Sequence, residues 1–315
     1  MQAVAQLLEH LRRESGKVVV GQEEFRDQCL VTLLCRGHAL VEGVPGVAKT
    51  LMVKTMARIL GLEFQRVQCT SDLMPADIIG TNVLNMATST FSLHKGPVFT
   101  DLLLVDEVNR MPPRTQAALL ECMEEYQVTI DGVRHQLPAE FSVFATQNPV
   151  EFEGTYPLPE AQLDRFLLKI RVPYPTADHE VEILANVQNG FEARELDNVL
   201  LEPLPTGLLA QAQAEVKTLK VEPALFSYIA QIARRTRDWP SLSLGASPRA
   251  AISIMVVARA MAAMDARDYI IPDDVKASAV PVLRHRVVLK PEAELEGLTS
   301  DLIIGELLKA VEVPK

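Results

Sequence analysis

The 315 residues suffice for two domains, and the 48% apolar and 23% charged residues are typical of a globular protein in water. The net charge of −10 argues against nucleic acid or an anionic membrane as a partner. The four cysteines form no CxxC pair, and no apolar run approaches the roughly 18 residues that span a membrane. We therefore expect a cytoplasmic, reduced protein without a disulfide framework or a zinc site.

Short apolar runs alternate with amphipathic stretches over the first two-thirds of the chain, a pattern typical of an α/β fold with a parallel sheet covered by helices. Residues 127–130 and 134–137 predict a β-hairpin around Asp131-Gly132, and residues 91–93 predict a further short β segment. The predicted sheet strands are residues 38–42, 63–68, 102–106, 141–146 and 166–172, and the predicted helices are residues 22–35, 49–60 and 113–126.

The composition changes at residues 172–177, where Pro173 and Pro175 flank Tyr174. Beyond this point no strand is predicted. Helical patterns instead cover residues 178–188, 207–216, 223–237, 248–265 and 272–283. We place a domain boundary near Pro175, with an α/β core at residues 1–175 and an all-helical domain at residues 176–315.

Residues 43–50, Gly-Val-Pro-Gly-Val-Ala-Lys-Thr, lie between a predicted strand and a predicted helix, the context of a phosphate-binding loop. In such a loop backbone N–H groups and the helix N-terminus bind phosphate oxygens. Lys49 would reach the β- and γ-phosphates, and the Thr50 hydroxyl would coordinate Mg²⁺. Since the usual motif has Gly where Ala48 stands, we expect ordinary backbone dihedrals at Ala48. The alternative is a plain Gly-Pro turn.

Two further polar motifs follow apolar strands. Asp106 and Glu107 end the strand at residues 102–106, where Asp106 would hold Mg²⁺ and Glu107 would polarise the attacking water. Asn148 follows the strand at residues 141–146, where it would orient that water or contact the γ-phosphate. By themselves the acidic pair could be a solvated turn and Asn148 part of an Asn-Pro turn.

Together these motifs resemble the MoxR family of AAA+ ATPases. The resemblance extends from about residue 20 to residue 314, and Ala48 fits it because the family's own loop ends in Ala-Lys-Thr. One departure is Ala266, which stands where the family usually has Gly. The stretches that carry the resemblance are residues 42–50, 106–116, 145–149, 154–166, 245–250 and 267–275.

The resemblance implies a five-stranded core with a helix-2 insertion at residues 81–95 and a pre-sensor-1 hairpin at residues 127–137, followed by an all-helical lid. It assigns Lys49 and Thr50 to Walker A, Asp106 and Glu107 to Walker B, and Asn148 to sensor 1. The implied nucleotide-binding residues are Val19, Val20 and Gly21 around the adenine, then Gly43, Val44, Pro45, Gly46, Val47, Ala48, Lys49, Thr50, Leu51 and Asp106.

The resemblance also assigns two arginines to catalysis. Arg165 matches the arginine finger, which would complete a neighbouring subunit's site, and Arg249 matches sensor 2, which would contact the nucleotide from the lid. The alternative for Arg165 is a surface ion pair with Asp164 or Glu160. The alternative for Arg249 is an exposed arginine in the first turn of a helix, where a cation opposes the helix dipole.

Two other groups of residues are less informative. Asn109 and Arg110 belong to the family signature without an assigned chemical role. Residues 284–286, Arg-His-Arg, are expected to form a solvated basic surface.

The resemblance implies an ATP- and Mg²⁺-dependent hydrolase that forms a homo-oligomeric, hexameric ring and remodels, matures or activates client proteins. A partner with a von Willebrand factor A domain would be a separate chain. The alternatives are a magnesium-chelatase-type ATPase subunit, a nucleotide-gated scaffold, and a nucleic-acid motor. The intact Glu107, Asn148 and Arg165 argue against the scaffold, and the net charge of −10 argues against the motor.

Overall fold

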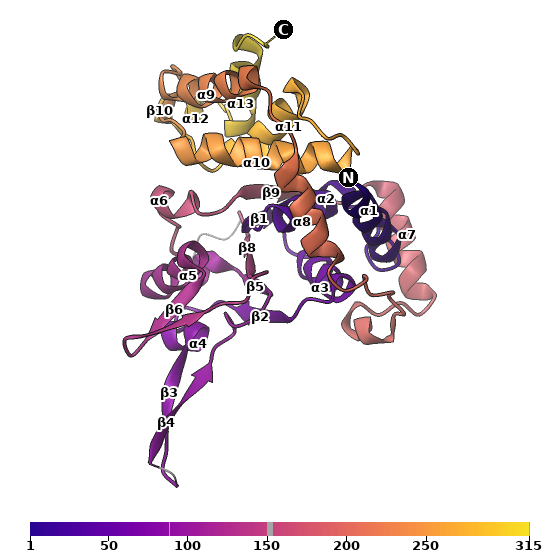
Figure 1. Ribbon diagram of the computed structural model, residues 1–315, viewed down its shortest axis with the longest axis vertical. Helices are drawn as coiled ribbons and strands as arrows, with labels where there is room; N and C mark the ends of the chain where they lie inside the picture. Colours follow the sequence, from indigo (N-terminus) through magenta and orange to yellow (C-terminus); the bar gives the residue numbers. More distant parts are fainter. Residues whose placement is uncertain (88, 150–153, 315) are drawn as a thin grey trace.

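The structure is a computed structural model that describes residues 1–87, 89–149 and 154–314. Its centre is a sheet of five parallel strands in the order β2-β5-β8-β1-β9, so the predicted α/β fold is confirmed. The sheet lies between a projecting hairpin and a bundle of helices (Figure 1). Its strands are β1 (Ala39–Gly43), β2 (Phe64–Gln68), β5 (Leu102–Asp106), β8 (Ser142–Gln147) and β9 (Leu168–Val172).

Successive side chains of each strand point to opposite faces, and both faces of the sheet are buried. Along β5, Leu102 and Leu104 face the cluster built by helices α1, α2 and α3. Leu103 and Val105 face the other cluster, which α5 and β6 cover. The bounds of these helices are α1 (Gln2–Ser15), α2 (Glu23–Leu34), α3 (Lys49–Leu60) and α5 (Pro113–Glu125).

Helix α1 was not predicted, although its buried residues Val4, Leu7, Leu8 and Leu11 have the spacing of an amphipathic helix. This helix packs along α8 (Leu208–Thr218), which belongs to the C-terminal part of the chain. Apolar contacts therefore run across the expected boundary near Pro175, which stays a prediction.

Two hairpins leave the core. The predicted hairpin is present as β6 (Gln127–Ile130) and β7 (Val133–Gln136). The short segment predicted at residues 91–93 is part of a longer pair, β3 (Gly80–Asn85) and β4 (Thr90–Lys95), which follows the short helix α4 (Pro75–Ile79). Thr88, within the expected insertion, lies outside the described residues. The β3–β4 pair projects far from the body of the molecule (Figure 1).

The five predicted C-terminal helices are present, and the C-terminal part also contains elements that the sequence did not predict. The predicted helices are α7 (Ala177–Gln188), α8, α9 (Pro223–Arg237), α10 (Pro248–Met264) and α11 (Pro272–Leu283). The additional elements are the 3-10 helix η2 (Ala193–Asn198), β10 (Leu242–Leu244), β11 (Val288–Leu289), α12 (Pro291–Leu295) and α13 (Ser300–Ala310). The strands β10 and β11 pair only with each other, which leaves the bundle essentially helical.

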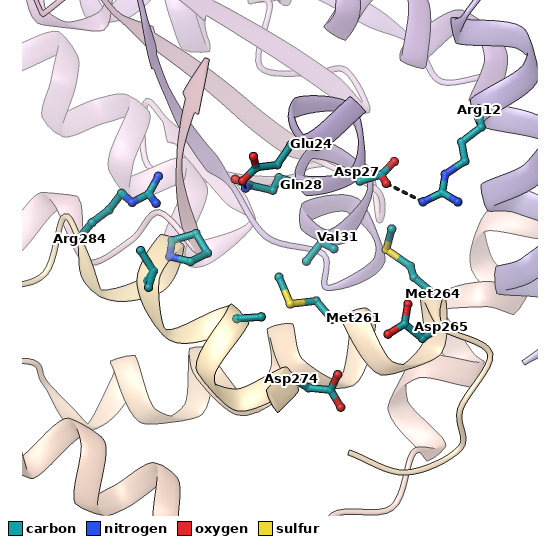
Figure 2. A pocket seen from close by; sticks show the side chains of 13 residues that line it. Arg12, Glu24, Asp27, Gln28, Val31, Met261, Met264, Asp265, Asp274 and Arg284 are labelled. Carbon is teal, nitrogen blue, oxygen red and sulfur yellow. Dashed lines mark hydrogen bonds and ion pairs between the residues drawn. The ribbon is translucent and has the colours of Figure 1, made fainter. Parts of the chain in front are cut away.

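A cleft of about 580 Å³ lies between α2 and the helices α10 and α11. Figure 2 shows Met261 and Met264 on one side of it and Val31 on the other, with the Arg12–Asp27 ion pair of 2.7 Å nearby. No residue of the phosphate-binding loop lines this cleft, which is therefore separate from the site described below.

Candidate nucleotide site

The predicted phosphate-binding loop connects β1 to the N-terminus of α3. A side chain at Gly43 would bring its Cβ to 2.8 Å from the carbonyl oxygen of Val172, so the close approach of β9 requires glycine there. The ammonium group of Lys49, the first residue of α3, donates to the carbonyl of Gly43. The cation is thus folded back over its own loop, at the helix terminus that favours anions.

Ala48 differs from its prediction. Its backbone is left-handed, at φ 61° and ψ 23°, because this residue turns the loop into the first turn of α3. A residue with a Cβ pays about 1–2 kcal/mol for this conformation, whereas glycine adopts it readily. The expectation of ordinary dihedrals was therefore wrong, and the chain holds a strained alanine beside Lys49.

The acidic motif lies across from the loop. Asp106 is buried, and its Oδ2 is 3.3 Å from the hydroxyl of Thr50. Thr146 donates to Oδ1 at 2.8 Å, and Arg66 forms an ion pair with Oδ2 at 2.7 Å. Carboxylate and hydroxyl oxygens are the ligands that Mg²⁺ prefers, so Thr50 and Asp106 fit the predicted metal site. The guanidinium group of Arg66 is thus a positive charge beside the Asp106 carboxylate that comes from the same chain.

Glu107 is held by three neighbours. Its backbone is left-handed at φ 58°, and its N–H donates to the Thr146 hydroxyl at 2.9 Å. At the side chain, Gln68 donates to Oε2 at 3.1 Å, and Arg110 approaches the same oxygen at 3.0 Å. The signature residue Arg110 thus holds the carboxylate predicted to polarise water. Asn109 is buried, and its carbonyl accepts a hydrogen bond from Tyr156.

The strand order brings Asn148 to the same edge of the sheet. Strand β8 lies between β1 and β5, and Gln147 pairs in register with Glu42, the residue before Gly43. Asn148 follows directly and is buried. Since the carboxyl ends of parallel strands share one edge, Asn148 lies between the phosphate loop and the acidic pair.

A pocket of about 180 Å³ adjoins the loop. Whole-ligand pockets measure about 300–1,000 Å³, so this pocket fits a part of a ligand such as a flat base. Val19 and Val20, which are predicted to lie around the adenine, line this pocket. Gly21 does not line it and instead approaches the His179 ring of α7. Its lining residues are Val18, Val19, Val20, Gln22, Gly46, Val47, Ala48, Leu51, Pro175, Ile183, Asn186, Val187, Phe191 and Ala193.

The two predicted catalytic arginines do not lie at this loop. Arg165 donates through Nε and Nη2 to Oε2 of Glu124, each at 2.8 Å, and Arg249 donates to Oε1 at 2.8 Å. The hydrogen bond from Arg249, followed by the charge of Arg165, lowers the pKa of Glu124. All three residues line a separate cleft of about 410 Å³, and no residue of the phosphate loop lines it.

This arrangement bears on what was expected of each arginine. Arg249 does not reach its own chain's phosphate loop, as a lid residue over the nucleotide would. Arg165 forms an ion pair, but with Glu124 in place of the expected Asp164 or Glu160.

The expected solvated basic surface at residues 284–286 is wrong, because His285 and Arg286 are buried. Arg286 forms a 2.6 Å ion pair with Asp164 and donates to the carbonyl of Phe166 at 2.7 Å. His285 also contacts that carbonyl at 2.9 Å, and burial lowers the pKa of its ring. An ion pair and backbone carbonyls thus bind the buried guanidinium of Arg286, which fixes the segment that carries Arg165.

A family model described as "ATPase family associated with various cellular activities (AAA)" matches residues 38–168, and one described as an AAA lid domain matches residues 234–307. A crystal structure of a protein from Cytophaga hutchinsonii superposes with a TM-score of 0.90 at 41% identity, covering 99% of this chain and 96% of the other.

Curated relatives match over nearly the full chain. Uncharacterized protein YeaC of Bacillus subtilis is 44% identical over 98% of this chain and 93% of its own length. Chaperone MoxR1 of Mycobacterium tuberculosis is 42% identical over 98% of this chain and 82% of its own length. Protein MoxR of Paracoccus denitrificans is 32% identical over 91% of this chain and 90% of its own length.

Proposed function

Because this chain belongs to the MoxR family of AAA+ ATPases, and is an ATP-hydrolysing enzyme, we propose that it works as a ring that remodels or activates client proteins. One observation carries the ring. Arg165 and Arg249 line a cleft apart from their own chain's phosphate loop, and both side chains are partly exposed to solvent. A second copy of the chain that brings its nucleotide to this cleft would place a γ-phosphate next to the two arginines.

Within one chain the proposed division of labour follows the geometry. The base occupies the pocket between Val20 and α7, while Lys49 and the loop N–H groups hold the phosphates. Thr50 and Asp106 hold Mg²⁺, which when bound would neutralise phosphate charge. Glu107 accepts a proton from the attacking water, and Asn148 orients that water.

The neighbouring chain completes the site in this proposal. Its Arg165 and Arg249 stabilise the charge that develops on the γ-phosphoryl group during transfer. Removal of the γ-phosphate then weakens the attraction between the two copies and changes their relative angle. We further propose that the ring is a hexamer.

The projecting β3–β4 hairpin is the proposed client contact. Its exposed apolar side chains include Val83, Met86 and Phe91, of which Met86 is 85% exposed. Residues 80–95 contain no Asp or Glu, and their one Lys or Arg is Lys95. This surface fits an apolar stretch of polypeptide better than a phosphate backbone, which needs several cations.

From the family resemblance we propose a partner with a von Willebrand factor A domain and a cytoplasmic location. No helix in the described part of the chain is long and apolar enough to cross a membrane.

A pull-down with Glu107→Gln, loaded with ATP, tests the function. The variant should retain a client protein that Lys49→Ala/Glu107→Gln, which cannot hold ATP, releases. Changing Met86 and Phe91 to Ser should lower client recovery and leave ATP hydrolysis unchanged.

Other outcomes would replace the proposal. Client recovery that depends on ATP, in a wild-type protein that scarcely hydrolyses it, would mean a nucleotide-gated scaffold. DNA binding that weakens steeply with salt would mean a nucleic-acid motor. Recovery of chelatase subunits would identify a magnesium-chelatase-type ATPase.

A further inference from the structure

Glu124 binds two arginines that come from opposite parts of the chain. Its two carboxylate oxygens are divided between them, with Arg165 on Oε2 and Arg249 on Oε1. Arg165 lies just after the short helix α6 (Glu160–Leu163), and Arg249 lies in the first turn of α10. Two guanidinium groups this close together repel each other unless an anion lies between them.

The helix ends make this contact more significant. Arg249 places a cation at the N-terminus of α10, and Glu124 places an anion in the last turn of α5. Each charge opposes the dipole of its own helix, which by itself is destabilising. Their mutual hydrogen bond offsets both costs, so the two residues are placed for each other.

The other carboxylate that lines this cleft, Asp164, already has partners. Asp164, the neighbour of Arg165 in sequence, gives Oδ1 to Arg286 at 2.6 Å and Oδ2 to the Ser247 hydroxyl at 3.1 Å. Glu124 is therefore the carboxylate that joins the two arginines. Each arginine also keeps N–H groups that Glu124 does not use: Arg165 contacts it through Nε and Nη2, and Arg249 through Nη2 alone.

We propose that Glu124 is a positioning residue that holds Arg165 and Arg249 together as one two-arginine site for the γ-phosphate bound by a neighbouring subunit. This rests on the proposed function, in which both arginines act on the next chain's nucleotide. Glu124 itself touches no phosphate. It fixes the spacing and orientation of the two guanidinium groups, whose unused N–H groups then bind the phosphate oxygens.

Glu124→Gln tests the proposal first. Gln keeps the shape of the side chain but loses the charge that holds two guanidinium groups. We expect kcat to fall about tenfold or more, with the KM for ATP changed less than about threefold, because Glu124 lies outside the chain's own pocket. Glu124→Asp keeps the charge but is too short to reach both arginines, so kcat should fall as well. The matched control is Glu125→Gln, an exposed neighbour on α5.

Mixed rings separate positioning from folding. Arg165→Ala offers an intact pocket, and Lys49→Ala offers intact arginines, so their mixture should regain activity. Adding Glu124→Gln to the Lys49→Ala chain should lower the regained activity about tenfold, because that chain supplies the arginines. Adding Glu124→Gln to the Arg165→Ala chain should change nothing. Thermal melting and exchange of fluorescently labelled subunits check that every variant folds and mixes.

Three results with Glu124→Gln would overturn the proposal. An equal fall from either placement of Glu124→Gln would make Glu124 merely structural, and no fall from either would make its contacts incidental. Faster hydrolysis by Glu124→Gln would mean that Glu124 competes with the phosphate for the arginines. If Lys49→Ala and Arg165→Ala exchange subunits yet regain no activity, action in trans fails, and the proposed function fails apart from any effect of Glu124.

Discussion

Arg110 lies 3.0 Å from Oε2 of Glu107, one turn of 3-10 helix further along the chain. Gln68 donates to the same oxygen at 3.1 Å. Both side chains contact Oε2, which restrains the carboxylate. Arg110 thereby acquires a role that the sequence could not give it: it orients the proposed base.

Glu107→Gln should bind ATP with near-normal affinity and hydrolyse it about 10²–10⁴-fold more slowly. The amide keeps the hydrogen-bonded shape but cannot take a proton from water, while Asp106 still holds the metal. Calorimetry and steady-state phosphate release measure the two properties. Near-normal turnover would refute the role of Glu107, and loss of ATP binding would instead make Glu107 a metal ligand.

Lys49→Ala should abolish measurable ATP binding, because it removes the cation that the structure folds over the phosphate loop. Titration calorimetry at micromolar ATP is the measurement. The control is Lys54→Ala on the same helix α3, beyond the loop, which should bind ATP like the wild type. Micromolar affinity in Lys49→Ala would place the nucleotide elsewhere.

Arg249→Ala should retain ATP binding, lose most hydrolysis and regain activity when mixed with Lys49→Ala. The reason is that Arg249 lies with Arg165, apart from its own phosphate loop. An arginine supplied in trans is worth about 10³–10⁵ in rate in other nucleotide hydrolases, and two arginines that share the task would each account for less.

Mixing distinguishes the two possible positions of Arg249. If it served its own chain's nucleotide, the Arg249→Ala pocket would stay defective beside any neighbour, and the mixture would remain inactive.

Activity per wild-type subunit should also rise steeply with protein concentration, because an isolated subunit lacks the arginines of a neighbour. Activity that is independent of concentration, over a range where the protein is monomeric, would contradict a shared site.

His38 should make the fold sensitive to mild acid. Its ring contacts the Met123 carbonyl at 3.0 Å and accepts from the Val143 N–H, and burial lowers its pKa to about 4. The unfolded chain, with a pKa near 6.5, takes up a proton first as the pH falls. The contribution of neutral His38 to the free energy of unfolding is therefore complete above pH 6.5. About 3 kcal/mol of it is lost as the pH falls from 6.5 to 4.

Urea unfolding at intervals from pH 7 to 5 measures this effect, in a range mostly above carboxylate titration. His38→Gln should be less stable at pH 7 by about 1–2 kcal/mol and show a flatter pH dependence. The buried His285 should leave part of the slope, since its pKa is lowered too. Exposed His94→Gln should match the wild type, and an unchanged slope in His38→Gln would contradict the prediction.

Local pattern was enough to predict the sheet and the loop. Each strand is an apolar run, which the pattern of apolar and polar residues identifies without knowledge of contacts. The loop is identified by its glycines and by its place between a strand and a helix. Lys49, Thr50, Asp106 and Asn148 follow because parallel strands end at one edge. Helix α1 could have been predicted in the same way, from the spacing of its buried residues.

Long-range pairs were beyond the sequence. Glu124 is one of several similar glutamates on α5, and only the fold shows that two distant arginines meet there. Arg66 and Thr146 likewise gain their roles from strand neighbours. The burial of Arg286 was predicted wrongly, because a basic run looks solvated until its ion pair with Asp164 is known.

That buried guanidinium also determines where the molecule can flex. Arg286, just beyond the end of α11, hydrogen-bonds Asp164, Phe166 and Leu167, so the helical bundle and the start of β9 are stiffly joined. We expect a rotation of the bundle to move Arg165 with it, because separating the two would break the hydrogen bonds of Arg286. On the other side of β9, α7 buries none of its residues, so it is packed less firmly than the bundle. Since Ile183, Asn186 and Val187 of α7 line the pocket proposed for the base, we expect α7 to be the helix that shifts when this pocket is filled.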